Sequence, residues 1–176
     1  QEETLATEKE NLVVSHKYTN QFTTEADLDK IRIPPVRHDR EETERRLAMA
    51  DEIFAGILEV KPQGRAPYLS LWDPISGWMS VEEALIALID RPDYIHRMLE
   101  RMTTAYLAML DSLEAQGLLT QPQSIIHCTG AYTDELPKEG YDPEAPRCRD
   151  NWMFGLAQML GTVSSEMYDE FEVQYA

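Results

Sequence analysis

The sequence has little cysteine and no long apolar run, and each shortage excludes a class of protein. Its two cysteines, Cys128 and Cys148, form no CxxC pair, so free thiols in a reducing compartment are expected. No segment approaches the roughly 18–20 consecutive apolar residues that a transmembrane helix needs. The polar, acidic start does not have the pattern of a signal peptide. Together these features favour a cytoplasmic protein.

Basic residues are also scarce. The chain has 16 Lys and Arg against 32 Asp and Glu, which gives a formal net charge of −16. Such a chain repels phosphate backbones and anionic lipid, so neither nucleic acid nor a membrane surface is expected as a partner. The plainest role of this acidity is to keep the protein soluble.

The common catalytic motifs are missing. The sequence contains no nucleophile elbow, phosphate loop or dinucleotide fingerprint. His127-Cys128 is the one adjacent pair of soft metal ligands, but structural zinc needs four ligands and catalytic zinc three. Only His38 and Cys148 could be added, and they have no metal-site spacing. No metal site is therefore predicted within this chain.

What the sequence does contain is an alternation of helical and strand patterns. Its 176 residues are enough for one domain with a hydrophobic core. The expected elements are an extended arm over 1–22 with a strand at 11–18, a short helix at 25–31, a helix from 39 to about 58, a strand at 66–72, helices at 80–89 and 92–116, a long loop at 120–148, and a strand at 153–157 with a helix after 163.

Capping residues place several of the helix ends. Thr24 to Asp27 and Ser80 to Glu83 match capping boxes, and Asp39 is a good N-cap. Pro92 suits a first helical position, and Gly117 stands where a C-terminal cap belongs. Apolar residues then repeat at helical spacing: Leu47, Ala50, Phe54 and Ile57 in one helix, and Ile95, Met98, Leu99, Met102, Tyr106, Met109, Leu110 and Leu113 in the longest.

This order predicts an α/β fold with a parallel sheet. A closed (β/α)8 barrel typically needs about 250 residues and at least about 200. Only two good central strands are present, at 66–72 and 153–157. The chain is therefore expected to be a partial, helix-rich TIM-barrel segment, preceded by a short N-terminal β-hairpin. Its parts are the arm at 1–22, a helix–strand–helix region at 23–119, the loop, and a final strand and helix at 149–176.

Two positions are the best candidates for ligand contact. Trp72-Asp73 follows the first central strand, and Gln158 ends the apolar run of the second. In parallel α/β folds, ligands bind at the carboxyl ends of strands. Rim packing is the alternative for Trp72. A structural hydrogen bond to a neighbouring loop is the alternative for Gln158, because a buried amide must find a partner.

These landmarks carry a family resemblance. The chain resembles the middle of the uroporphyrinogen decarboxylase superfamily, which also includes corrinoid-dependent methyltransferases. The loop at 132–137 is more similar to the methyltransferase-like branch than to the true decarboxylases. The matching segments, in order, are 25–31, the strand into Leu71-Trp72-Asp73, 88–93, 132–137, Ala157-Gln158 and 163–171.

The resemblance implies a single-domain barrel about twice this length, with its site at the strand C-termini. This chain would then be a central segment, inactive by itself. The residues implied for the substrate pocket are Trp72, Asp73, Tyr132, Trp152 and Gln158, and the catalytic residues stay unassigned. The implied reaction is methyl transfer involving a corrinoid or a small methylated compound. Zinc and a corrinoid would serve the full-length parent, with no cofactor held by this segment and a corrinoid protein as partner.

Two alternatives stay open. Decarboxylation of a porphyrinogen is the first, but its eight carboxylates call for an Arg-rich site, and Gln158 stands where decarboxylases commonly have Ser. The second is a non-catalytic assembly or binding module. Because two strands cannot close a barrel, a homo-oligomer or the missing barrel half would cover the open sheet edge.

Overall fold

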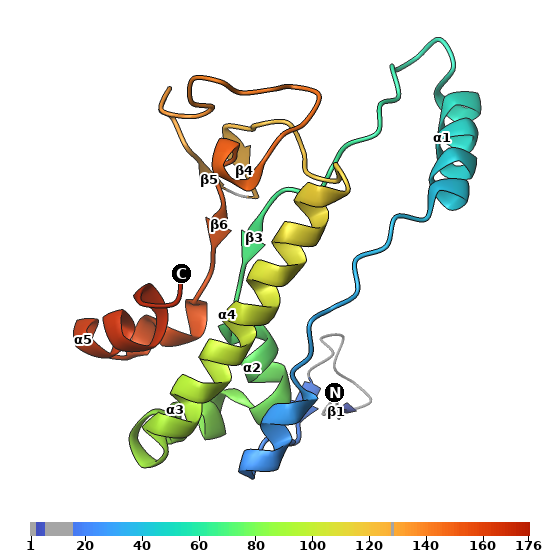
Figure 1. Cartoon of the computed structure of the whole chain (residues 1–176). Helices are drawn as coiled ribbons and strands as arrows, with labels where there is room; N and C mark the ends of the chain where they lie inside the picture. Colours follow the sequence, from blue (N-terminus) through green and yellow to red (C-terminus); the bar gives the residue numbers. More distant parts are fainter. Residues whose placement is uncertain (1–2, 6–15, 128) are drawn as a thin grey trace. The chain divides into compact units, whose positions relative to one another are not determined.

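The computed structural model describes residues 3–5, 16–127 and 129–176 (Figure 1). The chain divides into two compact units. Unit 1 comprises Gln1–Ile33, Tyr68–Leu107 and Gly155–Ala176, and unit 2 comprises Pro34–Pro67 and Ala108–Phe154. Helices account for 50% of the residues and strands for 8%. The protein is therefore helix-rich with small sheets.

Unit 1 contains most of the regular structure. Its elements are β1 (Glu3–Leu5), β2 (His16–Tyr18), η1 (Glu25–Lys30), β3 (Tyr68–Leu69), α2 (Trp72–Met79), α3 (Val81–Asp90), the first part of α4 (Pro92–Ala115), η3 (Gln158–Thr162), α5 (Ser165–Tyr168) and the π-helical turn η4 (Asp169–Val173). β1 pairs antiparallel with β2, as expected for an N-terminal hairpin.

Unit 2 is built mainly from loops. It holds α1 (Arg40–Phe54), the end of α4, β4 (Ile125–Ile126), β5 (Thr129–Gly130), η2 (Cys148–Asp150) and the start of β6 (Phe154–Gly155). β4 and β5 pair antiparallel within the long loop predicted at 120–148.

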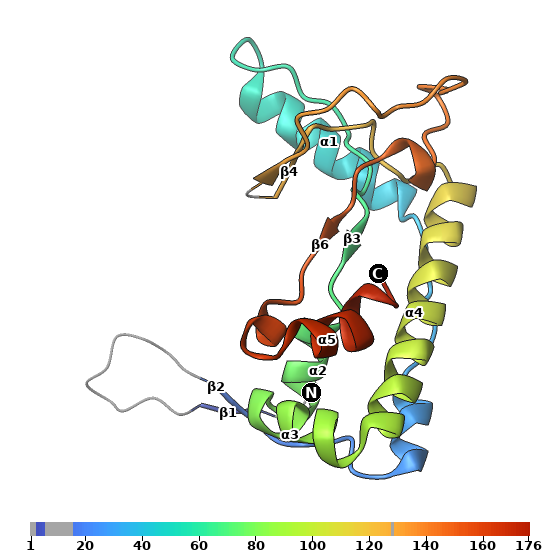
Figure 2. The same ribbon diagram turned by 90° about the vertical axis from the view of Figure 1, so that its left-hand side faces the viewer.

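β3 and β6 form the pair that organises unit 1 (Figure 2). The Leu156 amide, just after β6, donates to the Leu69 carbonyl at 3.0 Å. β3 leads towards α2 and β6 towards η3, and α2 contacts η3. The carboxyl ends of both strands therefore lie on the same side, and the pair is parallel. α2, α3 and α4 supply the helical connection that parallel strands require.

Both predicted central strands are shorter than expected. The run at 66–72 gives only β3, and Trp72 begins α2 instead of ending a strand. Asp73 and Pro74 do not end an element there, because the first-turn amides of a helix need no internal partner and an acidic side chain suits its positive end. Likewise the run at 153–157 gives only β6, and Gln158 begins η3.

The expectations for the N-terminal part and for α1 need further corrections. Of the strand predicted at 11–18, only His16–Tyr18 is observed, and 11–15 lie outside the described residues. α1 begins after the predicted N-cap Asp39, whose side chain accepts from the Glu42 amide at 3.0 Å, but ends at Phe54. No residue of α1 is fully buried: Leu47 and Ala50 of its apolar stripe are partly buried and Phe54 is exposed.

The other predicted helix ends are confirmed. Ser80 caps α3 and accepts from the Glu83 amide at 3.4 Å, and Pro92 begins α4. Gly117 adopts a left-handed φ of 65° after α4, a conformation that favours glycine. The Leu118 amide then donates to the Leu113 carbonyl at 2.9 Å, which closes a C-terminal cap of the Schellman type.

The hydrophobic core lies in unit 1. Trp72 and Ile75 of α2 pack with Ile95, Met98 and Leu99 of α4, and all five are fully buried. The methionine-containing stripe predicted for the longest helix therefore faces the core, as its helical spacing indicates.

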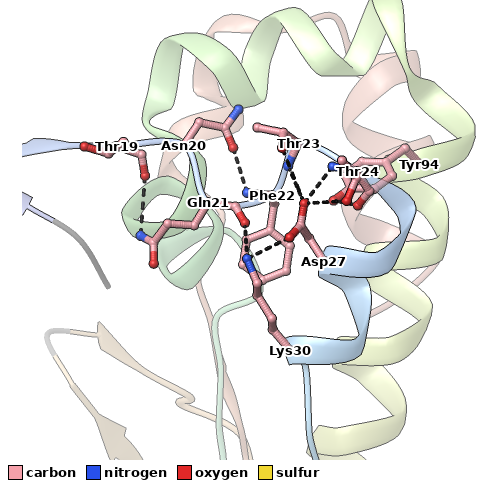
Figure 3. A network of polar contacts seen from close by, with 9 residues as sticks. All are labelled: Thr19, Asn20, Gln21, Phe22, Thr23, Thr24, Asp27, Lys30 and Tyr94. Carbon is pink, nitrogen blue, oxygen red and sulfur yellow. Dashed lines mark hydrogen bonds and ion pairs between the residues drawn. The ribbon is translucent and has the colours of Figure 1, made fainter.

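A polar network ties η1 to α4 at the edge of this core (Figure 3). The Asp27 carboxylate accepts from the backbone amides of Thr23 at 3.0 Å and Thr24 at 2.7 Å, and pairs with Lys30 at 2.7 Å. The Tyr94 hydroxyl donates to the Thr24 carbonyl at 3.1 Å. Lys30 first, and then the Thr24 amide, hold the pKa of Asp27 well below its usual range.

We expect Asp27→Asn to lower the urea midpoint at pH 7. Because the pKa of Asp27 is lower in the folded state than in the unfolded state, its contribution is present above about pH 4 and fades as pH falls towards the folded pKa. The difference between wild type and variant should therefore shrink when unfolding is repeated at pH 3. Asp90→Asn, at the exposed end of α3, is the control. An Asp27→Asn midpoint equal to that of wild type at pH 7 would contradict this account.

Candidate functional site

Trp72 lies deep in unit 1 and is fully buried. Its indole Nε1 donates to the Phe171 carbonyl at 3.2 Å. Tryptophan is rarely buried without a partner for this N–H group, and η4 provides one here. In the described structure Trp72 therefore packs in the core and holds η4 through this bond. It offers no exposed surface to a ligand.

Asp73 and Gln158 are exposed beside this buried support. Asp73 stands in the first turn of α2 and Gln158 begins η3. Since α2 contacts η3 and each follows one strand of the parallel pair, both side chains stand on elements that leave the carboxyl ends of β3 and β6. This arrangement places a carboxylate and an amide at the edge where parallel sheets bind ligands.

The other two predicted pocket residues belong to unit 2. Tyr132 is 90% exposed, and its ring lies against Gly130, where a Cβ would stand only 2.9 Å from Tyr132 Cζ. Trp152 lines a cavity of about 230 Å³ together with Thr133, Leu136 and other residues of the loop. The structure thus groups Trp72, Asp73 and Gln158 in one unit and Tyr132 and Trp152 in the other.

A polar centre that the sequence did not reveal surrounds His96 of α4. The Tyr175 hydroxyl lies 2.6 Å from His96 Nδ1, and Glu170 Oε1 lies 3.1 Å from Nε2. The imidazole also stacks on the Phe171 ring, with 4.8 Å between centroids. Because an ionised carboxylate only accepts hydrogen bonds, Nε2 donates to Glu170, and when the ring carries that single proton Nδ1 accepts from Tyr175.

Glu172 is the buried acid of this region and is 4% exposed. Among the described residues, its Oε2 atom has no hydrogen-bond partner. Burial raises the pKa of the Glu172 carboxyl, against a smaller lowering by a hydrogen bond from Trp72. A carboxyl group held in an apolar setting beside tryptophan is suited to donate a proton.

Ser70 adds a second buried polar atom, directly after β3. Its Oγ is buried and finds no partner among the described residues. Unpaired buried polar groups are uncommon in native proteins, and each calls for an explanation. Ser70 follows the carboxyl end of β3, where parallel sheets bind ligands. A hydrogen bond from its hydroxyl to a ligand would explain why this group has no protein partner.

We call Trp72, His96, Glu170, Glu172 and Tyr175 the C-terminal cluster. Burial first, and then the nearby carboxylates of Glu100 and Glu170, raise the pKa of the Tyr175 phenol. The phenol therefore remains protonated and acts as a donor, not as a nucleophile. The hydrogen bonds of the cluster fasten η4 and Tyr175 to α4 and to the start of α2.

This cluster could not be predicted from the sequence because its members are distant in the chain. His96 precedes Glu170 by 74 residues and Tyr175 by 79. A histidine beside a helical apolar stripe is typical of an ordinary helix face, and the run of acids near the end is typical of a solvated one. Only the close packing of η4 on α4 brings these side chains together.

The described part of the chain contains no group of metal ligands, and its one described cysteine is Cys148. Over residues 16–127 and 129–176, no three His, Cys, Asp or Glu side chains lie close enough to hold a metal ion. Cys128, of the predicted His-Cys pair, lies outside the described residues, while His127 stacks on Phe154 at 4.9 Å between ring centroids. Burial and Glu114 raise the pKa of the Cys148 thiol to about 11, so it carries no reactive thiolate at neutral pH.

Comparison with protein-family models, with curated proteins and with solved structures finds no match to this chain. No helix among the described residues combines the length and apolar character needed to cross a membrane.

We expect Glu172→Gln to stabilise the protein more at pH 8 than at pH 4. The folded-state pKa of Glu172 is raised, so ionisation opposes folding once pH exceeds the unfolded value of about 4.3. The glutamine amide does not ionise, so the variant avoids the unfavourable free energy of a buried carboxylate at pH 8. At pH 4, where the carboxyl group is largely protonated in the folded state, the substitution brings no such gain in stability. Urea unfolding at both pH values measures the change.

The control for this experiment is Glu144→Gln, which removes one exposed carboxylate from the loop of unit 2. It reports the general effect of losing a negative charge. If the stability gained by Glu172→Gln falls as pH rises, the carboxyl group is not held in the apolar setting described here.

Proposed function

We propose that this chain is a central segment of a barrel enzyme of the uroporphyrinogen decarboxylase superfamily, in the methyltransferase-like branch. The observation that carries the proposal is the parallel pair β3–β6 with its helical connection, followed directly by Asp73 and Gln158. Barrel enzymes bind their substrates at this end of the strands. In the proposal, Asp73 and Gln158 form one wall of the substrate pocket, and buried Trp72 supports that wall.

The charge of the chain supports methyl transfer over decarboxylation. A porphyrinogen with eight carboxylates needs a site rich in arginine. The wall described here instead presents the carboxylate of Asp73 and the neutral amide of Gln158, in a chain of net charge −16. Transfer of a methyl group from a corrinoid or a small methylated compound does not demand a basic site.

Methyl transfer of this kind uses a Lewis acid, usually zinc, to lower the pKa of an acceptor thiol. The described residues do not fit this role, because they contain no group of metal ligands. In the proposal, the metal belongs to the full-length parent, and the methylated corrinoid meets the wall of Asp73 and Gln158 as the methyl donor. The segment itself contributes substrate contacts and is inactive alone.

The proposal also requires something to cover the sheet. Within the described residues, β3 and β6 pair only with each other, so both outer edges of the pair lack a neighbouring strand. A second copy of the chain or the rest of the parent barrel would cover these edges. Light scattering distinguishes the two, since the purified chain is a dimer or larger in the first case and a monomer in the second.

Equilibrium dialysis of the purified chain against methylcobalamin, and separately against uroporphyrin, tests the proposed function. We expect saturable binding of methylcobalamin without loss of its methyl group. Gln158→Ala should weaken that binding about fivefold, the usual effect of losing one hydrogen bond. Gln174→Ala removes an exposed glutamine from the same unit and should leave binding unchanged.

Two results would count against methyl transfer. Failure of methylcobalamin to bind saturably contradicts the methyltransferase assignment directly. Saturable binding of uroporphyrin, weakened by Gln158→Ala, would instead favour decarboxylation of a porphyrinogen by the parent enzyme.

A further inference from the structure

Unit 2 contains a pocket that the proposed function does not use. Its volume is about 480 Å³, within the range of small-molecule sites. The apolar part of its lining includes Met109 and Leu113 of α4 and Leu118 just beyond it. The charged part includes Arg37 and Arg65, which come from opposite ends of the segment that contains α1. All of these residues belong to the same compact unit.

Hydrogen bonds fix both walls of this pocket. On one side, Gln116 Nε2 donates to the Val36 carbonyl at 3.0 Å and holds the coil next to Arg37. On the other side, the Arg65 amide donates to the Leu118 carbonyl at 2.7 Å, and the Arg65 carbonyl accepts from the Thr120 amide at 3.1 Å. The backbone positions beside both guanidinium groups are therefore set before any ligand arrives.

Gly64 allows the close approach on the Arg65 side. A Cβ at this position would lie 2.2 Å from the Leu119 carbonyl oxygen, which is much shorter than any real contact. Only glycine at position 64 lets the backbone come close enough for the two hydrogen bonds that hold Arg65 beside the pocket.

The turn that carries Arg37 is fixed in a similar way. The Thr43 hydroxyl donates its one proton to the Asp39 carbonyl at 2.7 Å. Its oxygen, 3.1 Å from His38 Nε2, must then accept from that ring nitrogen. His38 is thereby held against the first turn of α1, and Arg37 precedes it.

The carboxylates of the pocket are largely engaged elsewhere. Both Glu42 oxygens accept from arginines at 2.7 Å, one from Arg45 and the other from Arg45 and Arg46. These bonds, Arg45 first, lower the pKa of Glu42 to about 2, so the group stays ionised and neutralised by its partners. Asp39 accepts from the Glu42 amide as the helix cap.

Of the three arginines that line the pocket, Arg46 pairs with Glu42, whereas Arg37 and Arg65 do not. Across the described residues, no carboxylate lies within ion-pair distance of either guanidinium group. Two arginines without an ion-pair partner therefore line the same pocket as the apolar side chains of α4. Guanidinium groups bind carboxylate and phosphate oxygens in pairs of hydrogen bonds.

We propose that this pocket binds an amphipathic organic anion, with its carboxylate or phosphate head between Arg37 and Arg65 and its apolar body on Met109, Leu113 and Leu118. The site is separate from the wall formed by Asp73 and Gln158. It would allow unit 2 to bind a second ligand, an anion, although the chain as a whole is acidic.

Isothermal titration of the full chain tests this site with octanoate and octyl phosphate as probes. Octanamide, which has the same body without charge, and butyrate, which has the same head with a shorter body, are the matched ligands. We expect both octyl anions to bind and both matched ligands to bind at least about fivefold more weakly. The stronger of the two octyl anions identifies the preferred head group.

Arg65→Gln and Arg37→Gln should each weaken octanoate binding at least about fivefold, because each removes a charged hydrogen-bond donor. Arg40→Gln is the matched control, since Arg40 is close to Arg37 in sequence, at the start of α1, but does not line the pocket. Circular dichroism shows whether each variant folds. If Arg40→Gln weakened octanoate binding equally, the loss of affinity would come from the change in net charge, and the proposed site would be wrong. Absence of saturable binding by either octyl anion would overturn the proposal.

Discussion

The buried hydrogen bond from the Trp72 indole to the Phe171 carbonyl is the constraint on which unit 1 depends. Trp72 begins α2 immediately beyond β3, and Phe171 lies in the last helical turn of the chain, so this bond joins segments 99 residues apart. The fully buried ring fills the core below that turn, and the backbone of η4 satisfies its N–H group. Once η4 is held there, Phe171 stacks on His96, and the polar contacts of Tyr175 and Glu170 with the imidazole follow.

The candidate site takes its character from the same packing. Parallel pairing of β3 with β6 directs α2 and η3 away from one end of the strands, where Asp73 and Gln158 are exposed. Burial beneath η4 gives Glu172 its raised pKa, while Ser70 keeps an unpartnered hydroxyl beside the strand end. Such unpaired polar groups cost free energy of folding, and functional sites are where proteins retain them.

Local chemistry predicted much of this structure. The caps at Asp39, Ser80 and Gly117 lie where expected, because each depends on a few neighbouring residues. The apolar face of α4 was equally clear from its spacing. The strand at 66–72 was too long, since a short apolar run cannot distinguish a strand from the start of a buried helix. His96 and its partners were missed for a different reason: only tertiary packing brings them together.

Hydrogen exchange at the indole N–H groups tests the central claim most directly. The Nε1 proton of Trp72 should exchange only through global unfolding, so its exchange rate should rise with urea as steeply as the unfolding equilibrium does. Trp152, which is only partly buried in unit 2, provides the internal comparison. Exchange of the Trp72 proton as fast as that of Trp152 and insensitive to urea would show that η4 is not held on Trp72. The assembly of the C-terminal cluster described here would then be wrong.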